Sequence, residues 1–288
     1  MENITGILYV KFFIYYGSWF VFPLLYWFLK KRWVILILLS VLFIYARFVE
    51  PQLLFVNHYK IKTGFKAKYA LIADIHLGIY NNEHILERTV EKINNENVDA
   101  LLIAGDLSYE PQFSDMKKLF ASLAKVKIPI YAVLGNHDCQ RPGPDIRAEL
   151  EEILTSLGVH VITNKAVILN GITILGLGSR WAKDDEVSLL DKYTKDDNIL
   201  VLTHNPDTTL DYMPNHYPDL TVAGHTHGGQ IRIPYIYKKM IPVRGDMLWD
   251  QGLYEFKGTK VFITSGIGEI GLPLRFLIPP VIDVLELY

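Results

Sequence analysis

The sequence predicts an α/β protein, a four-layer αββα sandwich of two mixed sheets, preceded by an N-terminal hairpin of two transmembrane helices. Three observations support this prediction. The first fifty residues are almost uncharged, short apolar runs alternate with amphipathic stretches from residue 69 onward, and a strong hairpin signal occurs in the second half. A chain of 288 residues is long enough to form one full domain with appendages.

Two apolar runs occupy the N-terminal region. Residues 4–29 contain Lys11 as their only charged residue, and residues 33–49 contain only Arg47. Because a spanning helix needs about 20 mainly apolar residues, we expect a membrane anchor over residues 1–50. A linker over 51–68 and a catalytic domain over 69–288 would follow. The alternative is a pair of buried helices in a soluble protein.

The expected location is the plasma (inner) membrane, as an integral protein, but the face of the catalytic domain stays open. The basic residues between the two runs favour a cytoplasmic turn, with both ends of the hairpin outside. The basic residues after the second run favour the opposite orientation, with the catalytic domain in the cytoplasm. The two groups are Lys30, Lys31 and Arg32, and Arg47, Lys60, Lys62 and Lys66. A cleaved signal peptide fits poorly, since no basic start precedes a short apolar core.

Net charge and cysteine content exclude some classes of protein. The formal net charge is -2 and the pI is near 6.5, so no nucleic-acid partner is expected. The single cysteine, Cys139, rules out an internal disulfide framework. The oligomeric state is not predicted.

Strand and helix signals alternate in the first half of the domain. Apolar runs over 69–73, 100–104 and 128–134 predict buried strands, and residues 83–94 and 113–124 have apolar residues at helical spacing. This alternation predicts parallel strands with right-handed crossovers. In such sheets, functional residues gather beyond the carboxyl ends of the strands.

The second half predicts a second mixed sheet that packs against the first, with helices outside. Strands are expected over 199–202, 220–223, 261–265 and 281–287. Residues 167–178 predict a hairpin, because Asn170-Gly171 is a strong two-residue turn signal.

Seven oxygen- and nitrogen-bearing side chains follow the predicted strands: Asp74, His76, Asp106, Asn136, His204, His225 and His227. Histidines two residues apart project to the same side of an extended segment, and the glycines beside His225 and His227 would leave room for a ligand. Such ligands without cysteine suit Mn, Fe or Zn. Seven are too many for one tetrahedral ion but fit two divalent metal ions that share a carboxylate. Two metals about 3.5–4 Å apart promote phosphoryl displacement by a bridging hydroxide.

These blocks resemble the signature of the calcineurin-like metallophosphoesterases: D-x-H, G-D, G-N-H-D, a lone H and G-H-x-H, in that order from Asp74 to His227. The resemblance implies that one metal is held by Asp74, His76 and His227, and the other by Asn136, His204 and His225, with Asp106 between them. It also implies two catalytic residues. His137 would protonate the leaving oxygen and Asp138 would orient His137.

Residues 224–234 and 265–280 are similar to the membrane-associated branch of this family, which includes UDP-2,3-diacylglucosamine pyrophosphatases of lipid A assembly and cell-envelope phosphodiesterases. The resemblance implies hydrolysis of a phosphodiester or pyrophosphate in a phospholipid or nucleotide-lipid substrate. The alternatives are a phosphoprotein or cyclic-nucleotide phosphatase with the same site, or a non-catalytic membrane scaffold.

The basic residues near the predicted site remain open to two interpretations. Loops 234–242 and 272–280 combine apolar residues with Lys238, Lys239 and Arg275, so they either rest among lipid headgroups or pack on the core. Arg141, Arg232 and Arg244 either meet a substrate phosphate or are solvated surface charges. Four histidines outside the motifs are expected to be ordinary surface or helix residues: His58, His84, His160 and His216.

Overall fold

The computed structural model describes residues 26, 32–111, 115–139, 145–216, 218–243 and 249–288. The chain divides into two compact units, residues 1–46 and residues 47–288. The first predicted membrane run, residues 4–29, lies outside the described residues except for Tyr26, as do Lys30 and Lys31 of the basic turn.

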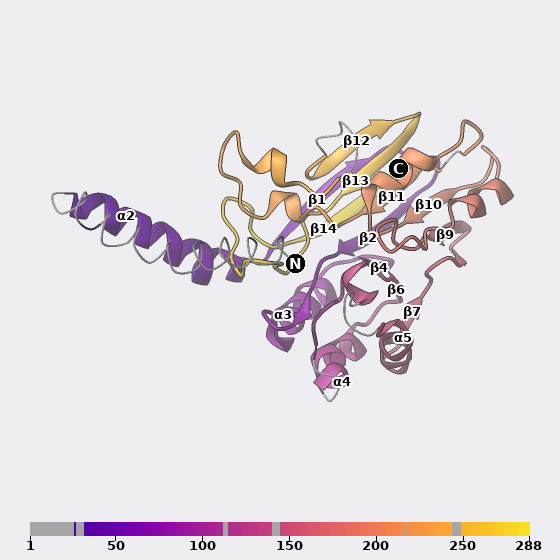
Figure 1. Ribbon diagram of the computed structural model, residues 1–288. Coiled ribbons are helices and arrows are strands. Elements are labelled where there is room, and N and C mark those ends of the chain that lie inside the picture. Colours follow the sequence, from indigo (N-terminus) through magenta and orange to yellow (C-terminus); the bar gives the residue numbers. More distant parts are fainter. Residues whose placement is uncertain (1–25, 27–31, 112–114, 140–144, 217, 244–248) are drawn as a thin grey trace, which may run out of the picture. The chain divides into compact units, whose positions relative to one another are not determined.

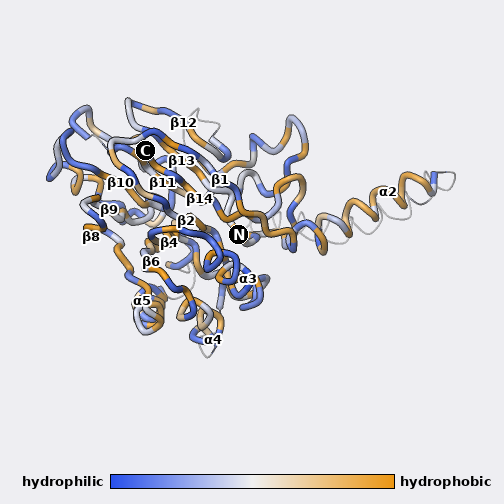
Figure 2. Tube along the Cα trace, turned by 180° about the vertical axis from the view of Figure 1, so that it is seen from behind, coloured by the Kyte–Doolittle hydropathy of each residue, from blue (hydrophilic) through white to orange (hydrophobic). Residues whose placement is uncertain are grey.

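The second predicted membrane run is helical. Helix α2 (Trp33–Ile44) is followed by a π turn, η1 (Tyr45–Val49), and a 3-10 turn, η2 (Glu50–Gln52). Residues 33–52 have a mean hydropathy of 2.1 and are 11% buried, and they form the one stretch within the described parts of the chain that is long and apolar enough to span a membrane. Figure 2 shows the apolar character along α2. One such helix does not establish the predicted hairpin.

The first sheet has six strands in the order β1-β14-β2-β4-β6-β7. The strands are β1 (Phe55–Ile61), β14 (Val281–Leu287), β2 (Ala67–Ile72), β4 (Ala100–Ala104), β6 (Ile130–Val133) and β7 (Val159–Val161). β14 pairs with β2 antiparallel, and the other pairs are parallel. The expectation that residues 281–287 belong to the second sheet was wrong, since β14 lies between β1 and β2. Residues 51–68, expected as a linker, therefore contain a strand. β1 escaped prediction because its sequence, FVNHYKI, is half polar and half exposed at the sheet edge.

The second sheet is also mixed, in the order β12-β13-β11-β10-β9-β8. The strands are β12 (Gly252–Phe256), β13 (Thr259–Ile263), β11 (Leu220–Ala223), β10 (Ile199–Leu202), β9 (Ile172–Gly176) and β8 (Ala166–Leu169). The predicted hairpin is confirmed, since β8 and β9 pair antiparallel around Asn170 and Gly171, both with positive φ.

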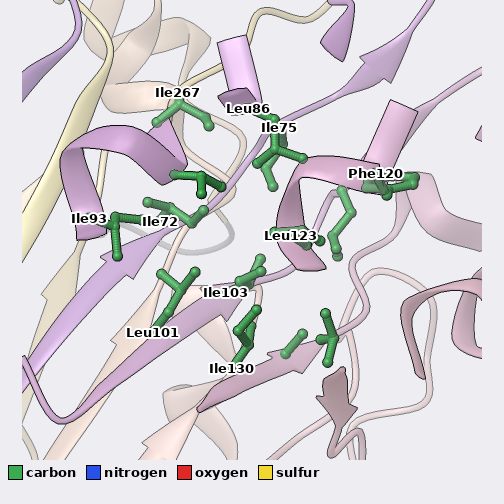
Figure 3. Close-up of a cluster of buried hydrophobic side chains, with 14 of the residues drawn as sticks. Ile72, Ile75, Leu86, Ile93, Leu101, Ile103, Phe120, Leu123, Ile130 and Ile267 are labelled. Carbon is green, nitrogen blue, oxygen red and sulfur yellow. The ribbon is translucent and has the colours of Figure 1, made fainter. Parts of the chain in front are cut away.

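Side-chain alternation divides the strands between two apolar cores. In β4, Leu102 and Ala104 join the core between the sheets, whereas Leu101 and Ile103 join the core beneath the helices. This is the two-residue periodicity of a strand buried on both faces. Figure 3 shows the helix-side core, where Leu86 and Phe120 pack over the sheet.

Helices α3 (Glu83–Asn94), α4 (Met116–Phe120) and α5 (Arg147–Ser156) cover the outer face of the first sheet (Figure 1). The helix expected over 113–124 is α4 followed by a 3-10 turn, η4 (Ala121–Lys125). Helix α5 was not predicted.

The fourth layer differs from the expectation. In the described residues, two 3-10 turns, η6 (Val187–Lys192) and η7 (Pro206–Asp211), stand in place of the expected helices, and the small core outside the second sheet takes residues from η6 and Tyr212 after η7. η6 contributes Val187, Leu189 and Leu190 and η7 contributes no residue of its own, which is too little for the apolar stripe of a longer helix.

Candidate metal centre

All seven predicted ligands lie at the carboxyl ends of strands from both sheets. β2, β4 and β6 lead to Asp74, Asp106 and Asn136, and β10 and β11 lead to His204 and His225. Six of the seven fall into two groups whose ligand atoms lie within 4.8 Å of one another. The first group is Asp74, His76 and His227, and the second is Asp106, His204 and His225.

The first group converges on one point. The Nε2 atoms of His76 and His227 are 3.1 Å apart, and His227 Nε2 is 3.6 Å from Asp74 Oδ1. The Asp74 carboxylate also accepts the backbone N–H of His225 at 2.9 Å. This bond ties the carboxylate after β2 to the turn after β11, so the two sheets hold the group together.

The second group lies beside the first. His204 Nε2 is 3.2 Å from His225 Nδ1 and 3.1 Å from Asp106 Oδ2. The same Oδ2 atom is 3.6 Å from His76 Nε2 in the first group. Because Asp106 Oδ1 accepts the backbone N–H of His137 at 2.9 Å, Oδ2 is left to face both groups. Asp106 is therefore the one carboxylate placed to be shared.

The donor set fits divalent cations. His204 Nδ1 lies 2.8 Å from the carbonyl oxygen of Ala104, which can only accept, so Nδ1 carries the proton and Nε2 is free as a ligand. Asn136 Oδ1 is buried and has no hydrogen-bond partner. A buried acceptor without a donor is costly unless something positive meets it, and a cation between the groups would do so.

Burial and charge shift the pKa values of these groups in opposite directions. Burial lowers the pKa of His76 and that of His225 to about 3, so both rings are neutral ligands near pH 7. Burial alone would also lower the pKa of His204, but the Asp106 carboxylate raises it to about 9. The pKa of Asp106 is held well below its ordinary value by His204, against the effect of burial. A metal ion would compete with a proton for His204 Nε2.

The backbone at the site is strained. Asp74, His76, Asp106, His225 and His227 all have φ between 49° and 70°, a left-handed conformation that non-glycine residues seldom adopt. The expectation that His225 and His227 sit on an extended segment was therefore wrong. Thr226 between them is in the helical region, and a 3-10 turn, η8 (His227–Gly229), begins at His227. The two rings diverge into different groups because the chain turns sharply.

The role expected for the flanking glycines also needs correction. A Cβ added to Gly224 would lie 2.4 Å from the Cβ of Ala73 and 2.8 Å from Asp74 Oδ2. Glycine at this position lets the turn after β11 approach the end of β2, so the space is filled by protein and is not left for a ligand. Close contact between the two sheets brings the ligand groups together.

His137 and Asp138 begin a 3-10 turn, η5 (His137–Cys139), that follows β6. The His137 ring is half-buried, and its centroid lies 5.2 Å from that of His76. The Asp138 carboxylate accepts from Ser108 N and Oγ and from Gly135 N at 2.8–2.9 Å, and more weakly from Leu107 N. These bonds join the loops after β4 and β6. Asp138 was expected to orient His137. Its carboxylate instead binds backbone N–H groups and the Ser108 hydroxyl, so it orients the backbone of the site and not the His137 ring.

A cavity of about 420 Å³ opens over the second group. Asp106, Asn136, His137, His225 and His227 form its polar wall. Its other wall consists of apolar or amide side chains that sequence reasoning largely missed: Trp181, Gln230, Ile231, Pro242, Ile270 and Leu272. Trp181 stands with its ring centroid 4.8 Å from that of His225. No local pattern marked Trp181, whereas Gln230 adjoins the G-H-x-H block.

Of the predicted basic residues, the described arginines Arg232 and Arg275 do not reach the cavity as free charges. Arg232 pairs with Asp250, and Arg141 and Arg244 lie outside the described residues. Arg275 is fully buried and donates to the carbonyl oxygens of Gly268, Ser265 and Ile278, so it cannot face a lipid headgroup.

The four histidines outside the motifs are ordinary structural residues. His58, His84 and His160 are exposed or half-exposed. His216 was expected to be a surface or helix residue, but it is buried outside any helix, and its Nε2 lies 2.9 Å from Asp191 Oδ1.

Comparisons with known proteins agree with this geometry. Residues 67–229 match the family model described as calcineurin-like phosphoesterase. An uncharacterized metallophosphoesterase of Helicobacter pylori is 29% identical over 84% of this chain, which spans only 65% of that relative. Phosphodiesterase YaeI of Escherichia coli is 29% identical over 76% of this chain and 82% of its own length. UDP-2,3-diacylglucosamine pyrophosphatase LpxG of Chlamydia muridarum is 24% identical over 84% of this chain and 92% of its own length.

Proposed function

The chain belongs to the calcineurin-like phosphoesterase family, and on that premise we propose that it is a membrane-anchored, dinuclear-metal phosphohydrolase acting on a lipid-linked phosphodiester or pyrophosphate. Its membership makes it a metal-dependent phosphoester hydrolase. The observation that carries the proposal is the Asp106 carboxylate, whose Oδ2 atom faces both groups of candidate ligands.

We assign the ligands by group. Asp74, His76 and His227 would hold one divalent ion, and Asn136, His204 and His225 the other, with Asp106 shared. When bound, two such ions supply a nucleophile from water at neutral pH and neutralise charge on the phosphate oxygens. Mn, Fe and Zn all suit this oxygen and nitrogen donor set.

His137 is the proposed acid for the leaving group. Its ring lines the cavity beside Asp106 and Asn136 and is half-exposed, so it can reach a substrate oxygen that leaves toward the open side. Asp106 Oδ1 fixes the His137 backbone, and Asp138 fixes the loops on both sides of it. The protein therefore presents the imidazole at a fixed place next to the metal groups.

The apolar wall of the cavity supports a substrate with an apolar part. Trp181, Ile231, Ile270 and Leu272 face the same space as the candidate ligands, so a phosphate at the polar wall would leave its organic substituents against apolar side chains. Helix 33–52 would keep the enzyme at a bilayer, and LpxG carries in its name a lipid-linked nucleotide substrate. These observations favour a phospholipid or nucleotide-lipid substrate.

The test is hydrolysis by the full-length protein in detergent after metal removal and reloading with Mn. We expect bis-p-nitrophenyl phosphate to be hydrolysed only by the reloaded protein. A panel of UDP-diacylglucosamine, a phosphoprotein and cyclic AMP then identifies the substrate class, and the lipid-linked pyrophosphate should give the highest kcat/KM. Equal activity in the stripped and reloaded protein would refute the metal assignment, and a preference for phosphoprotein or cyclic AMP would refute the substrate class.

A further inference from the structure

Five exposed apolar side chains lie in the two chain segments that continue from the cavity-lining residues Ile231 and Leu272. We call Ile233, Tyr235, Ile236, Leu272 and Leu277 the apolar rim. Their side chains are 46–95% exposed, and Tyr235 is the most exposed of them at 95%. Leu272 also lines the cavity. Exposed aromatic and aliphatic residues gathered beside a binding cavity mark an interaction surface more often than a solvated one.

Backbone hydrogen bonds join the two segments of the rim. Phe276 N donates to Gln230 O at 3.0 Å, and Arg232 N donates to Phe276 O at 2.9 Å. The side-chain amide of Gln230 donates to the carbonyl oxygens of Ile270 and Leu272 at 2.9 and 2.8 Å. Figure 1 shows the two segments side by side, the first in orange and the second in yellow. The rim is therefore a fixed surface, held by the residue that follows the G-H-x-H turn.

The same surface is tied to the end of the apolar helical stretch. Glu50, in η2, is 1% exposed, and its carboxylate accepts the backbone N–H groups of Leu277 at 2.9 Å and of Ile278. Phe48, Val49, Leu53 and Phe55 around it are exposed. Within residues 47–288, an exposed apolar surface thus continues from the residues around Glu50 to Leu277. A segment leaving a bilayer at residue 52 would hold Leu277 near the headgroups.

Among the described residues, the exposed charge beside the apolar rim is positive. In the segment 233–243, Lys238 and Lys239 are the charged residues, and both are exposed. The acidic residues that the structure describes nearby, Glu50, Asp250 and Glu269, are at least nine-tenths buried. Exposed lysines beside aliphatic and aromatic residues match the headgroup layer of an anionic bilayer, which attracts basic side chains.

We propose that the apolar rim is a membrane-docking surface, which rests in the headgroup layer of an anionic bilayer so that the cavity opens toward the lipid. The docking itself stands on the exposed side chains and their charge, whereas the passage of a lipid substrate into the cavity rests on the proposed function. Tyr235 and Ile236 insert, and Lys238 and Lys239 meet lipid phosphates. A substrate whose phosphate lies at the bilayer surface reaches the metal groups without leaving the membrane.

A depth measurement on the full-length chain tests the docking without using activity. Tyr235→Cys carries an environment-sensitive fluorophore, and Ile168→Cys, 77% exposed in β8 at the far edge of the second sheet, is the matched control. Labelling is selective because Cys139 is buried and burial raises the pKa of its thiol to about 11. The protein is reconstituted in vesicles of phosphatidylcholine and phosphatidylglycerol.

We expect spin-labelled lipid to quench the probe at position 235 and iodide to quench the probe at 168. Similar quenching at both positions, or strong iodide quenching at 235, would overturn the docking surface. Shielding of position 235 in detergent that increases with protein concentration would also overturn it, because a second copy of the chain would then cover the rim.

An activity comparison tests the link to substrate. The double variant Tyr235→Ser with Ile236→Ser should hydrolyse bis-p-nitrophenyl phosphate in detergent like the wild type. Its hydrolysis of a lipid-linked pyrophosphate in vesicles should fall about fivefold or more, whereas Ile168→Ser should leave both rates unchanged. An equal rate on the vesicle substrate would contradict substrate delivery. Should the wild type hydrolyse neither substrate, the proposed function fails, and the quenching result still decides on the docking surface.

Discussion

One wall of the cavity, which we call the metal wall, consists of polar side chains that follow the strands of two packed sheets, and the other consists of apolar or amide side chains from loops. In the metal wall, Asp106 is 1% exposed and His225 is 6% exposed, and both have a strained, left-handed backbone. In the apolar rim, Tyr235 and Leu272 are largely solvent-exposed and lie in irregular segments. The difference indicates that reactivity is fixed by the fold, while contact with substrate and membrane is carried by a surface that can change without disturbing the fold.

We expect the largest loss of activity when the carboxylate shared by the two ligand groups, Asp106, is removed. Asp106→Ala removes the oxygen that faces both groups, so metal content should fall and kcat/KM on bis-p-nitrophenyl phosphate should drop about 1,000-fold or more. Elemental analysis and the hydrolysis assay measure the two quantities. Asp196→Ala, at an exposed acidic residue, is the control. Activity within about tenfold of the wild type would remove Asp106 from the metal wall.

His137→Ala tests whether the half-exposed ring is an acid or a ligand. Loss of the proton donor should slow an alkyl phosphodiester about 100-fold or more, because an alkoxide leaves poorly unless it is protonated. A p-nitrophenyl ester should lose less than about tenfold, and metal content should stay unchanged. His84→Ala, at an exposed histidine in α3, is the control. Loss of metal from the His137 variant would make His137 a ligand.

Gly224→Ala tests the contact between the sheets that brings the two groups together. The added Cβ would lie 2.4 Å from Ala73 Cβ, so the turn after β11 must move. We expect a loss of about 3 kcal/mol in the free energy of unfolding, together with weaker metal binding. Gly258→Ala, where an added Cβ meets no atom within 4 Å, should lose only about 1 kcal/mol for its positive φ. Equal losses would mean that the close contact is not needed.

The smallest effect concerns Asp283, a buried carboxyl behind the rim. Burial raises its pKa from 3.8 to about 6, against the hydrogen bonds from Thr264 and Asn57. Because the folded-state pKa is the higher one, the charged form destabilises the fold at high pH, and this penalty is lost as pH falls through about 6 toward 3.8.

Asp283→Asn should therefore be more stable than the wild type at pH 8, by about 1–3 kcal/mol, and the advantage should shrink at pH 5. Thermal unfolding of the full-length protein at the two pH values measures this. An advantage that grows on acidification would contradict the assigned direction of the pKa shift.

The sequence predicted the strands that carry the metal wall because their apolar runs end abruptly in Asp, Asn or His. The same residues could not reveal how the wall is assembled. Left-handed backbone at His225 and the contact of Gly224 with Ala73 depend on the second sheet packing against the first, and no local pattern records that contact. The extended geometry expected for His225 and His227 failed for this reason.

The apolar rim was harder to predict. Arg275 and Lys238 both lie in loops that combine apolar and basic residues. Arg275 is buried and donates hydrogen bonds to backbone carbonyl oxygens, whereas Lys238 is exposed. Trp181 reaches the cavity from a loop with no periodicity. β1 was missed because polar residues interrupt its apolar pattern at a sheet edge. In partly exposed segments, tertiary contacts decide which side chains are buried, and the composition of the segment does not predict it.

Anomalous X-ray diffraction from Mn-loaded crystals of the full-length protein decides the claim that two divalent ions share Asp106. We predict two anomalous peaks about 3.5–4 Å apart. One should lie beside Asp74, His76 and His227, the other beside His204 and His225, with Asp106 Oδ2 between them. A single peak at full Mn loading, or two peaks of which only one contacts Asp106, would contradict the claim.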